Sequence, residues 1–376
     1  MEETALYVHI PFCDHKCIYC DFYSIITSDN INNFLQALKK EIESYSYKYS
    51  TARYFSSIFF GGGTPSLMNP DYIGDIISTL RDHFRIANNA EITMETNPGT
   101  VDKNKLDMFR KIGINRLSFG VQSFHNDELK FLTRIHDKET AIRAVNEAKE
   151  VGFDNISIDL IFNLPKQTKE KWKQNLETAL SLPIKHISTY SLILERGTIL
   201  NKMILDGKVT LQGEDYDAEL YEITIDYLTS LGFEQYEVSN FAKSGFECRH
   251  NNAYWRYNEY LSFGPSAHSF ADNKRWWNYS SLKRYISEIE KNGFAQANHE
   301  FISDEQKFNE YVMLALRSKG IDRTDFQKRF GIEWLEEKEG ILNSFVDKKF
   351  MEMKGNLISF TKNGYAICDE ILGKLL

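Results

Sequence analysis

The sequence has few cysteines, and they are unevenly spread. Only five occur in 376 residues, and three of them, Cys13, Cys17 and Cys20, lie within eight positions of one another. So few thiols exclude a disulfide framework, and their clustering is typical of metal binding in a reducing compartment. Cys248 and Cys368 stand alone and are expected to be small buried apolar residues.

The sequence also lacks long apolar runs and an excess of positive charge. No run approaches the roughly 18 apolar residues of a membrane-spanning helix, and the N-terminus "MEETALYVHI" has no basic segment before an apolar stretch, so we expect a cytoplasmic protein. Forty-five basic and 53 acidic side chains give a net charge of −8, which argues against a nucleic-acid partner. With 42% hydrophobic residues, the chain can bury one large core and a smaller second one.

Short apolar runs alternate with helical patterns from residue 6 to about residue 195. This alternation predicts an α/β fold, with a parallel sheet covered by helices. Polar residues, glycines and cysteines recur just after the runs, where parallel barrels and open α/β sheets build their sites, so we expect them to meet at one barrel mouth. The six runs are "LYVHI", "SIFFGGG", "EITMETNP", "RLSFGVQS", "NISIDLIFN" and "HISTYSLIL".

The remainder of the chain predicts two further parts. A helical pattern leads into "FEQYEVSNFA", which predicts one extra strand, and an irregular aromatic region follows. Beyond residue 303, three helical segments precede "KKFMEMKGNLISFT", two apolar runs that predict a hairpin, and a last amphipathic helix. We therefore expect a barrel over 1–235, a connector over 236–300 and a small winged-helix-like α+β domain over 301–376.

The three clustered cysteines have the spacing C-x3-C-x2-C, directly after the first apolar run. Three thiolates at Cys13, Cys17 and Cys20 can hold three irons of a [4Fe–4S] cubane and leave the fourth iron open to another ligand. A structural zinc ion is the alternative, since a Cys3His site could recruit His15 or His9. The spacing alone does not decide between these two kinds of site.

The segment "GGGTP", from Gly61 to Pro65, ends the second apolar run. Glycines let the backbone approach a ligand, and Thr64 adds a hydroxyl, although a strand-to-helix turn needs glycine for geometry alone. Together with the cysteine loop, this segment resembles the radical S-adenosylmethionine (SAM) superfamily. That resemblance implies that the amino and carboxylate groups of SAM bind the open iron.

Further motifs extend this resemblance over nearly the whole chain. "YVHIPFC", "FFGGGTPSL", "ETNPGT", "FGVQSF", "IDLIFNLPKQT" and "GPSAHSF" are similar to the anaerobic coproporphyrinogen III oxidase family, which implies a partial (β/α)6 barrel. The resemblance implies ligation of the cluster by Cys13, Cys17 and Cys20. The family commonly has glycine where this chain has Thr133. The SAM contacts that it implies are Tyr7, Tyr19, Gly62, Gly63, Thr64, Glu95, Gln122, Arg134 and Asp159.

Each of these SAM contacts also has an ordinary structural explanation. The two tyrosines could be core or rim aromatics, the charged residues could pair on the surface, and the residues at strand ends could cap helices. Their shared position after the strands favours a binding site.

Two motifs separate two branches of this family. The oxidases usually extend the cysteine motif to C-x3-C-x2-C-x-C, and the position of the additional cysteine is Phe22 in this chain. The sequence instead resembles the haem-chaperone branch, which has "CDF" at this point and the pattern H-N-x-x-Y-W. That pattern runs here from His250 to Trp255.

The H-N-x-x-Y-W pattern has a chemical interpretation. His250 can offer a neutral imidazole to haem iron, while Tyr254 and Trp255 offer flat apolar faces to the macrocycle. A histidine among aromatics is also common as a hydrogen-bonded structural residue. His268 is a second histidine that could be a ligand or a core residue.

Two functions follow from the resemblance. The first is a haem chaperone that carries one [4Fe–4S] cluster, SAM and haem, and delivers haem to an acceptor protein, for which a membrane-associated respiratory enzyme is one candidate. The second is an oxygen-independent coproporphyrinogen III oxidase, which decarboxylates propionates by radical chemistry. Phe22 and the His250 pattern favour the chaperone, and the retained cofactor motifs keep the enzyme open. A nucleic-acid regulator using the C-terminal domain is disfavoured by the net charge.

Overall fold

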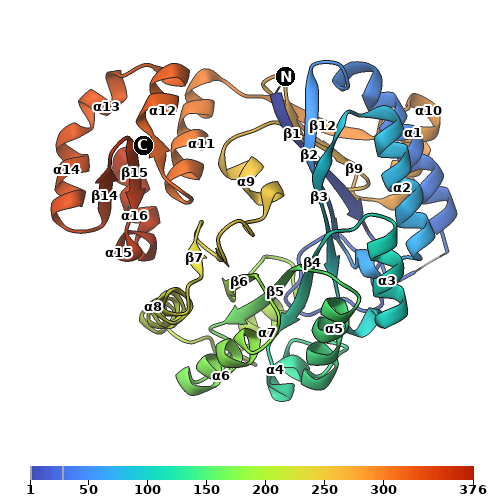
Figure 1. Ribbon diagram of the computed structural model, residues 1–376, viewed down its shortest axis with the longest axis horizontal. Helices are drawn as coiled ribbons and strands as arrows, with labels where there is room; N and C mark the ends of the chain where they lie inside the picture. The colour runs from blue at the N-terminus through green and yellow to red at the C-terminus, as the bar shows by residue number, and fades with distance from the viewer. Residues whose placement is uncertain (1, 28) are drawn as a thin grey trace.

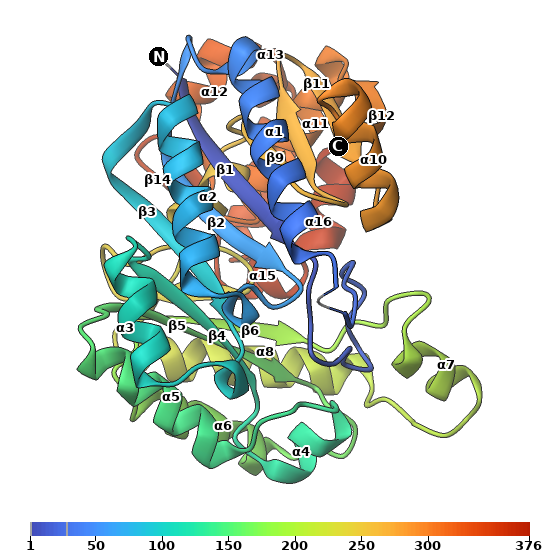
Figure 2. The same cartoon turned by 90° about the vertical axis from the view of Figure 1, so that its right-hand side faces the viewer.

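The computed structural model describes residues 2–27 and 29–376. Within this part of the chain, twelve strands form one mixed sheet in the order β12-β11-β10-β9-β1-β2-β3-β4-β5-β6-β8-β7, and three others form a small separate sheet. Helices cover the outer face of the large sheet (Figures 1 and 2). The strands of the large sheet are β1 (Glu2–Ile10), β2 (Arg53–Gly62), β3 (Ile86–Thr96), β4 (Arg116–Gln122), β5 (Asn155–Phe162), β6 (His186–Ser191), β7 (Glu234–Gln235), β8 (Asn240–Ala242), β9 (Tyr260–Phe263), β10 (His268–Ala271), β11 (Lys274–Asn278) and β12 (Gln296–Phe301).

The helices of this larger part follow the strands, as the alternation predicts. Several begin at a side chain that accepts a backbone N–H: Asn69, Asp102, Asp137 and Thr168 cap four of them. They are α1 (Ile31–Tyr49), α2 (Pro70–His83), α3 (Lys103–Lys111), α4 (Asn126–Phe131), α5 (Lys138–Glu150), α6 (Lys169–Leu180), α7 (Ile199–Leu205), α8 (Glu214–Ser230), α9 (Arg249–Trp255) and α10 (Leu282–Asn292).

The six predicted strands are β1 to β6, and they pair in parallel in chain order. Their central residues are buried on both faces, as expected of parallel strands covered by helices. The pairing of the described strands leaves β12 and β7 as the two ends of the sheet, so this is a partial barrel. The carboxyl ends of β1 to β6 meet at one mouth.

Two regions differ from the expectation. "FEQYEVSNFA" was predicted to be one strand, which is wrong: it forms the hairpin β7 and β8, because the chain reverses so that β8 can pair antiparallel with β6. The region expected to be irregular adds four strands to the sheet. Of these, β9 pairs in parallel with β1, so the first strand of the chain lies inside the sheet with a neighbour on each side.

The C-terminal part has its own apolar core (Figure 1, orange to red). Four helices, one more than predicted, precede the expected hairpin, and aromatic rings from the first three pack around Phe326. In the described residues no helix combines the length and the apolar character needed to cross a membrane. The elements are α11 (Asp304–Leu316), β13 (Ile321–Asp322), α12 (Arg323–Phe330), α13 (Glu333–Glu337), α14 (Glu339–Asp347), β14 (Met351–Lys354), β15 (Leu357–Phe360), α15 (Lys362–Ala366) and α16 (Cys368–Leu375).

Candidate functional site

The loop after β1 carries the three clustered cysteines, and two buried residues, Phe12 and Ile18, hold it in place. Phe12 is 1% exposed and packs edge-to-face against Phe34, with ring centroids 5.4 Å apart. The buried Ile18 donates its N–H to Thr133 Oγ1 at 3.3 Å, and its carbonyl accepts the N–H of Leu200 at 2.9 Å. These contacts fix the loop backbone and leave the thiols half-buried at the mouth.

The three thiols line one small cavity of about 60 Å³. Cys13 Sγ lies 3.2 Å from Thr64 Oγ1, and Arg134 Nη1 donates to Cys17 Sγ at 3.5 Å. Burial raises the pKa of the Cys13 thiol, and it raises that of Cys20 to about 11. Because both groups hold their protons strongly, a metal that binds them as thiolates must displace those protons.

The arrangement of donors fits a cluster better than a single ion. Among the described residues, no group of three His, Cys, Asp or Glu side chains is arranged to hold one metal ion. Of the two proposed zinc ligands, His15 lines the thiol cavity. His9 lies outside it, and its ring nitrogens contact Tyr23 O at 2.9 Å and Tyr7 Oη at 3.2 Å. Three thiols around one hollow suit a cubane, which takes one thiolate on each of three irons.

The glycine triplet makes room for the cysteine loop. Gly62 has φ +106°, and a Cβ at this position would lie 2.5 Å from His9 Cε1. A Cβ at Gly63 would lie 2.7 Å from the carbonyl oxygen of Phe12. The N–H of Gly62 donates to Glu95 Oε2 at 3.2 Å. The triplet therefore packs the loop against β2 and positions a carboxylate.

Eight of the nine predicted SAM contacts line one cavity of about 420 Å³, here called the mouth cavity. They come from the cysteine loop, from the ends of β2 to β5 and from the turn after α4, and Cys20 lies on the same wall. Asn97 and Tyr190 also line it and were not predicted, although Asn97 belongs to the quoted "ETNPGT" motif. The eight are Tyr19, Gly62, Gly63, Thr64, Glu95, Gln122, Arg134 and Asp159.

Two buried carboxyl groups give the mouth cavity its electrostatic character. Burial, together with the smaller effect of the nearby Asp159, raises the pKa of Glu95 to about 8. Burial also raises the pKa of Asp159, which accepts the hydroxyl of Ser118 at 3.0 Å. Neither carboxylate forms an ion pair with a described residue. Such a pair of groups suits a cationic ligand that also carries hydroxyl groups.

Gln122 and Thr133, near the mouth cavity, have a left-handed backbone conformation. Gln122 has φ 70°, and the β4–β5 register shifts between Gly120 and Gln122. Thr133 has φ 57°, so this β-branched residue adopts the left-handed conformation that glycine adopts easily, at the position where the family commonly has glycine. The next residue, Arg134, donates to Gly120 O at 2.6 Å. Left-handed backbone at non-glycine residues is often found at binding sites.

A second cavity of about 380 Å³, here called the aromatic cavity, adjoins the mouth cavity. The two share Asp21 and Phe22, and the Phe22 side chain is 64% exposed. Tyr7, the ninth predicted SAM contact, lines this cavity and not the mouth cavity. The lining residues are Tyr7, His9, Asp21, Phe22, Tyr23, Tyr254, Tyr260, Ser262, Ser266, Ala267 and His268.

His250 lies behind this wall. Its side chain is 2% exposed, and its ring stacks on Phe59 with centroids 4.9 Å apart. Its ring nitrogens contact Ser57 Oγ at 3.2 Å and Tyr254 Oη at 3.0 Å, and burial lowers its pKa to about 3. The structure therefore does not bring His250 to either cavity, and its role as a haem ligand stays a prediction.

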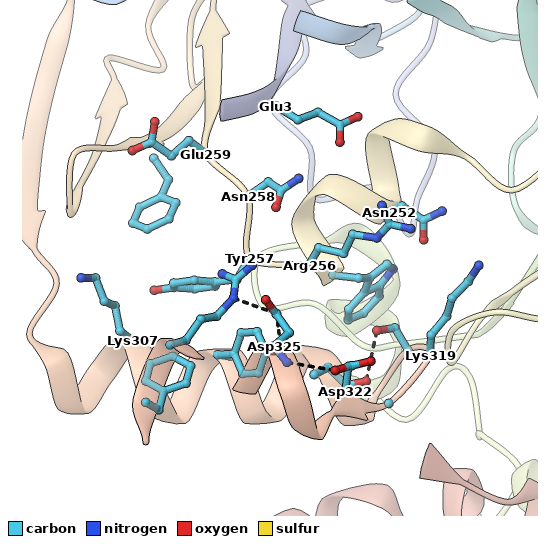
Figure 3. A pocket seen from close by; sticks show the side chains of 18 of the residues that line it. Glu3, Asn252, Arg256, Tyr257, Asn258, Glu259, Lys307, Lys319, Asp322 and Asp325 are labelled. Atoms are coloured by element: carbon cyan, nitrogen blue, oxygen red, sulfur yellow. Dashed lines mark hydrogen bonds and ion pairs between the residues drawn. The ribbon is translucent and has the colours of Figure 1, made fainter. Parts of the chain in front are cut away.

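A third hollow, the interdomain cleft, lies between the α9–β9 region and the C-terminal part (Figure 3). Its volume is about 870 Å³. Trp255 and Arg256, at the end of the H-N-x-x-Y-W segment, face it, and Lys307 and Asp325 lie on the opposite side. No His, Cys or Met is among the described residues that line this cleft.

The chain was compared with known proteins. Residues 7–179 match the Radical SAM superfamily model. The chain is 33% identical to the heme chaperone HemW of Bacillus subtilis (strain 168), over 99% of both chains. It is 31% identical to the heme chaperone HemW of Lactococcus lactis, over 100% of this chain and 98% of the relative.

A solved structure has the same fold. It is the coproporphyrinogen III oxidase (HemN) from Escherichia coli, a radical SAM enzyme, with a TM-score of 0.83 and 24% identity over 100% of this chain and 90% of that one. This likeness establishes the fold, with the partial barrel and the C-terminal part together. By its superfamily match and by its similarity to two HemW proteins over nearly its whole length, the chain belongs to the HemW family of radical SAM proteins.

Proposed function

We propose that this protein is a haem chaperone: it binds haem, one [4Fe–4S] cluster and SAM, and transfers haem to an acceptor protein that requires it. The observation that carries the proposal is the position of Phe22. This residue lies between the mouth cavity and the aromatic cavity, with 64% of its side chain exposed. A phenyl ring there offers an apolar face to a macrocycle and supplies no thiol for redox chemistry.

The mouth residues divide into cluster ligands and SAM contacts. Cys13, Cys17 and Cys20 would hold three irons of the cluster and leave the fourth iron open to SAM; Cys20 also lines the mouth cavity. Glu95 and Asp159 would receive the cationic and hydroxyl-bearing parts of SAM. When bound, the cluster supplies one electron for reductive cleavage of the sulfonium.

The other mouth residues position and enclose this site. The N–H of Gly62 holds the Glu95 carboxylate in place, and Arg134 ties the cysteine loop to the end of β4 through Cys17 and the carbonyl of Gly120. Tyr19, on the cysteine loop, lines both the thiol cavity and the mouth cavity, so it would adjoin both the cluster and SAM.

The oxidase is the second candidate, because eight of the nine predicted SAM contacts line the mouth cavity and the fold matches that of an oxidase. The two candidates predict different activities for a chain that has Phe22. An oxidase would convert porphyrinogen catalytically despite this residue. A chaperone would bind finished haem and release it to an acceptor.

One anaerobic experiment separates the two candidates. The cluster is reconstituted, haemin is titrated while the Soret band is recorded, and coproporphyrinogen III is then supplied with SAM and a reductant. We expect stoichiometric haem binding with no protoporphyrinogen product. Turnover at a catalytic rate would overturn the chaperone proposal. Transfer is then tested by mixing the haem-loaded protein with an apo-cytochrome, where a spectral shift to the acceptor's bands is expected.

A further inference from the structure

The aromatic cavity is the hollow in the described part of the chain that combines flat apolar walls with histidine. Five aromatic rings line it, from the ends of β1 and β9, the cysteine loop and α9. Its volume is about 380 Å³, and it shares the exposed Phe22 with the mouth cavity of about 420 Å³. Both volumes fall within the range of about 300–1,000 Å³ typical of small-molecule sites.

Two histidines line this cavity, and they differ in availability. His9 is 5% exposed, and both of its ring nitrogens have close partners, Tyr7 Oη and Tyr23 O. His268 is exposed at the start of β10, where its ring stacks on Trp277 with centroids 5.6 Å apart and an interplanar angle of 20°. In the part of the chain that the structure describes, its nitrogens have no hydrogen-bond partner. The stacking fixes the plane of the ring and leaves its nitrogens free.

The electrostatic surroundings of His268 suit a neutral imidazole. Partial burial lowers its pKa, and Arg275 on β11 lowers it further, while Glu300 on β12 opposes this. Arg275 itself is held by Glu300 at 2.9 Å and Glu310 at 2.6 Å, so it stays beside the histidine. Iron binds the unprotonated form of imidazole.

The other candidate positions offer less to a haem iron. His250 would have to leave Ser57, Phe59 and Tyr254 before its nitrogens could reach a ligand. The interdomain cleft is larger, yet none of its described lining residues is His, Cys or Met.

We propose that haem binds in the aromatic cavity with His268 as an axial ligand to its iron. This inference rests on the proposed haem-chaperone function and assigns its cargo site. The imidazole donates a lone pair to iron, with no change in oxidation state. Asp21 lines the side shared with the mouth cavity, so the negatively charged propionates of a bound haem would avoid that side.

The test compares haemin binding by the cluster-loaded wild type with that by His268→Ala and a matched control, His299→Ala. His299 is also an exposed histidine, but it lies on β12 outside the cavity. We expect His268→Ala to lose the histidine-ligated absorption and EPR signature and to bind haemin at least tenfold more weakly. Added imidazole should restore the signature, and His299→Ala should match the wild type.

Two further variants keep the test decisive. His268→Met retains a side chain of similar volume and should shift the spectrum toward thioether ligation, with unchanged circular dichroism and cluster absorbance. His250→Ala should keep the histidine signature. A His268 series that matches the wild type, or a signature lost only in His250→Ala, would overturn the assignment and leave the chaperone function standing. A wild type that binds no haemin would overturn both.

Discussion

The mouth cavity and the interdomain cleft are two hollows with opposite arrangements of charge. The cleft is larger, 870 against 420 Å³, but two of its acids already have cationic partners: Asp325 pairs with Arg329 at 2.8 Å, and Glu259 pairs with Arg53 at 2.6 Å. The mouth holds Glu95 and Asp159 buried and without a described ion pair. A buried carboxyl group without an ionic partner destabilises the fold, so proteins retain one mainly where a ligand binds it. Such a group therefore indicates a binding site better than cavity volume does.

Removal of the cluster thiols tests the mouth most severely. Replacing Cys13, Cys17 and Cys20 together by Ala should abolish the cluster, because no other described thiol lines the 60 Å³ cavity. Iron content and the visible absorbance of the reconstituted protein measure this loss, and both should fall to background. Cys368→Ala, which removes a half-buried thiol elsewhere, is the control and should keep both signals. A triple variant that retains its iron would contradict the assignment.

A core substitution tests whether the barrel with its connector and the C-terminal part, 301–376, unfold separately, as the proposed boundary at residue 301 implies. Phe326 is fully buried among the rings of Phe308, Phe330 and Trp334. Phe326→Ala should destabilise the C-terminal part by about 3–5 kcal/mol and leave cluster absorbance unchanged.

Calorimetry and absorbance-detected melting measure these two effects. The matched control, Phe119→Ala in the barrel core, should lower the melting temperature of the cluster signal instead. If Phe326→Ala shifted both transitions equally, the boundary would not separate two folding units.

The pH dependence of stability tests whether burial raises the pKa of Glu95 in the mouth cavity. The folded protein holds the Glu95 proton up to about pH 8, whereas the unfolded chain releases it near 4.5. The wild type therefore loses stability as the pH rises from 4.5 through 8, and Glu95→Gln should not. The pKa difference corresponds to about 4 kcal/mol between pH 5 and pH 9. In cluster-free protein, the melting temperature of the variant relative to the wild type should therefore rise by roughly ten degrees over this range, since ~1 kcal/mol corresponds to ~2–4 °C.

The cleft supplies the control for this measurement. Asp325→Asn alters a carboxylate that is already paired with Arg329, so the pH profile of this variant should parallel that of the wild type. If the difference in melting temperature between Glu95→Gln and the wild type did not change across this pH range, Glu95 would not have a raised pKa in the folded protein.

The smallest effect is expected at Thr133. Thr133→Gly relieves a left-handed backbone that costs about 1 kcal/mol or more, but it removes the acceptor of the Ile18 N–H, which is worth a similar amount. Chemical denaturation should show a change below about 1 kcal/mol. Lys349→Gly in the C-terminal part, also left-handed at φ 61°, loses no side-chain acceptor and should stabilise by about 1 kcal/mol. A Thr133 variant that gains as much as Lys349→Gly would show that the Ile18 contact contributes nothing.

Sequence patterns predicted the parallel strands and the meeting of the cysteine loop with Glu95, Gln122 and Asp159. Gln122 ends β4, whereas Glu95 and Asp159 lie within β3 and β5. The prediction succeeded because these strands are parallel neighbours whose carboxyl ends share one edge. The roles of these residues in binding SAM stay predictions.

Long-range pairing could not be predicted. The burial of His250 depends on Ser57 and Phe59 of β2, almost 200 positions earlier, and nothing local to the H-N-x-x-Y-W pattern indicates this packing. The strand β9 lies beside β1 for the same reason: its partner is about 250 residues away. "FEQYEVSNFA" was misjudged because its reversal is forced by β6, not by a glycine or proline in the segment.

The place of β1 inside the sheet has a consequence for biosynthesis. The cysteine loop is synthesised well before β9, and β1 lacks one of its two neighbours until β9 is made. The loop itself is pinned by Tyr23 to Leu282. Since domains assemble as units during synthesis, we expect the backbone around the three cysteines to become ordered only after β9 and Leu282 have been made. A cluster held by these thiols would then be inserted after that point.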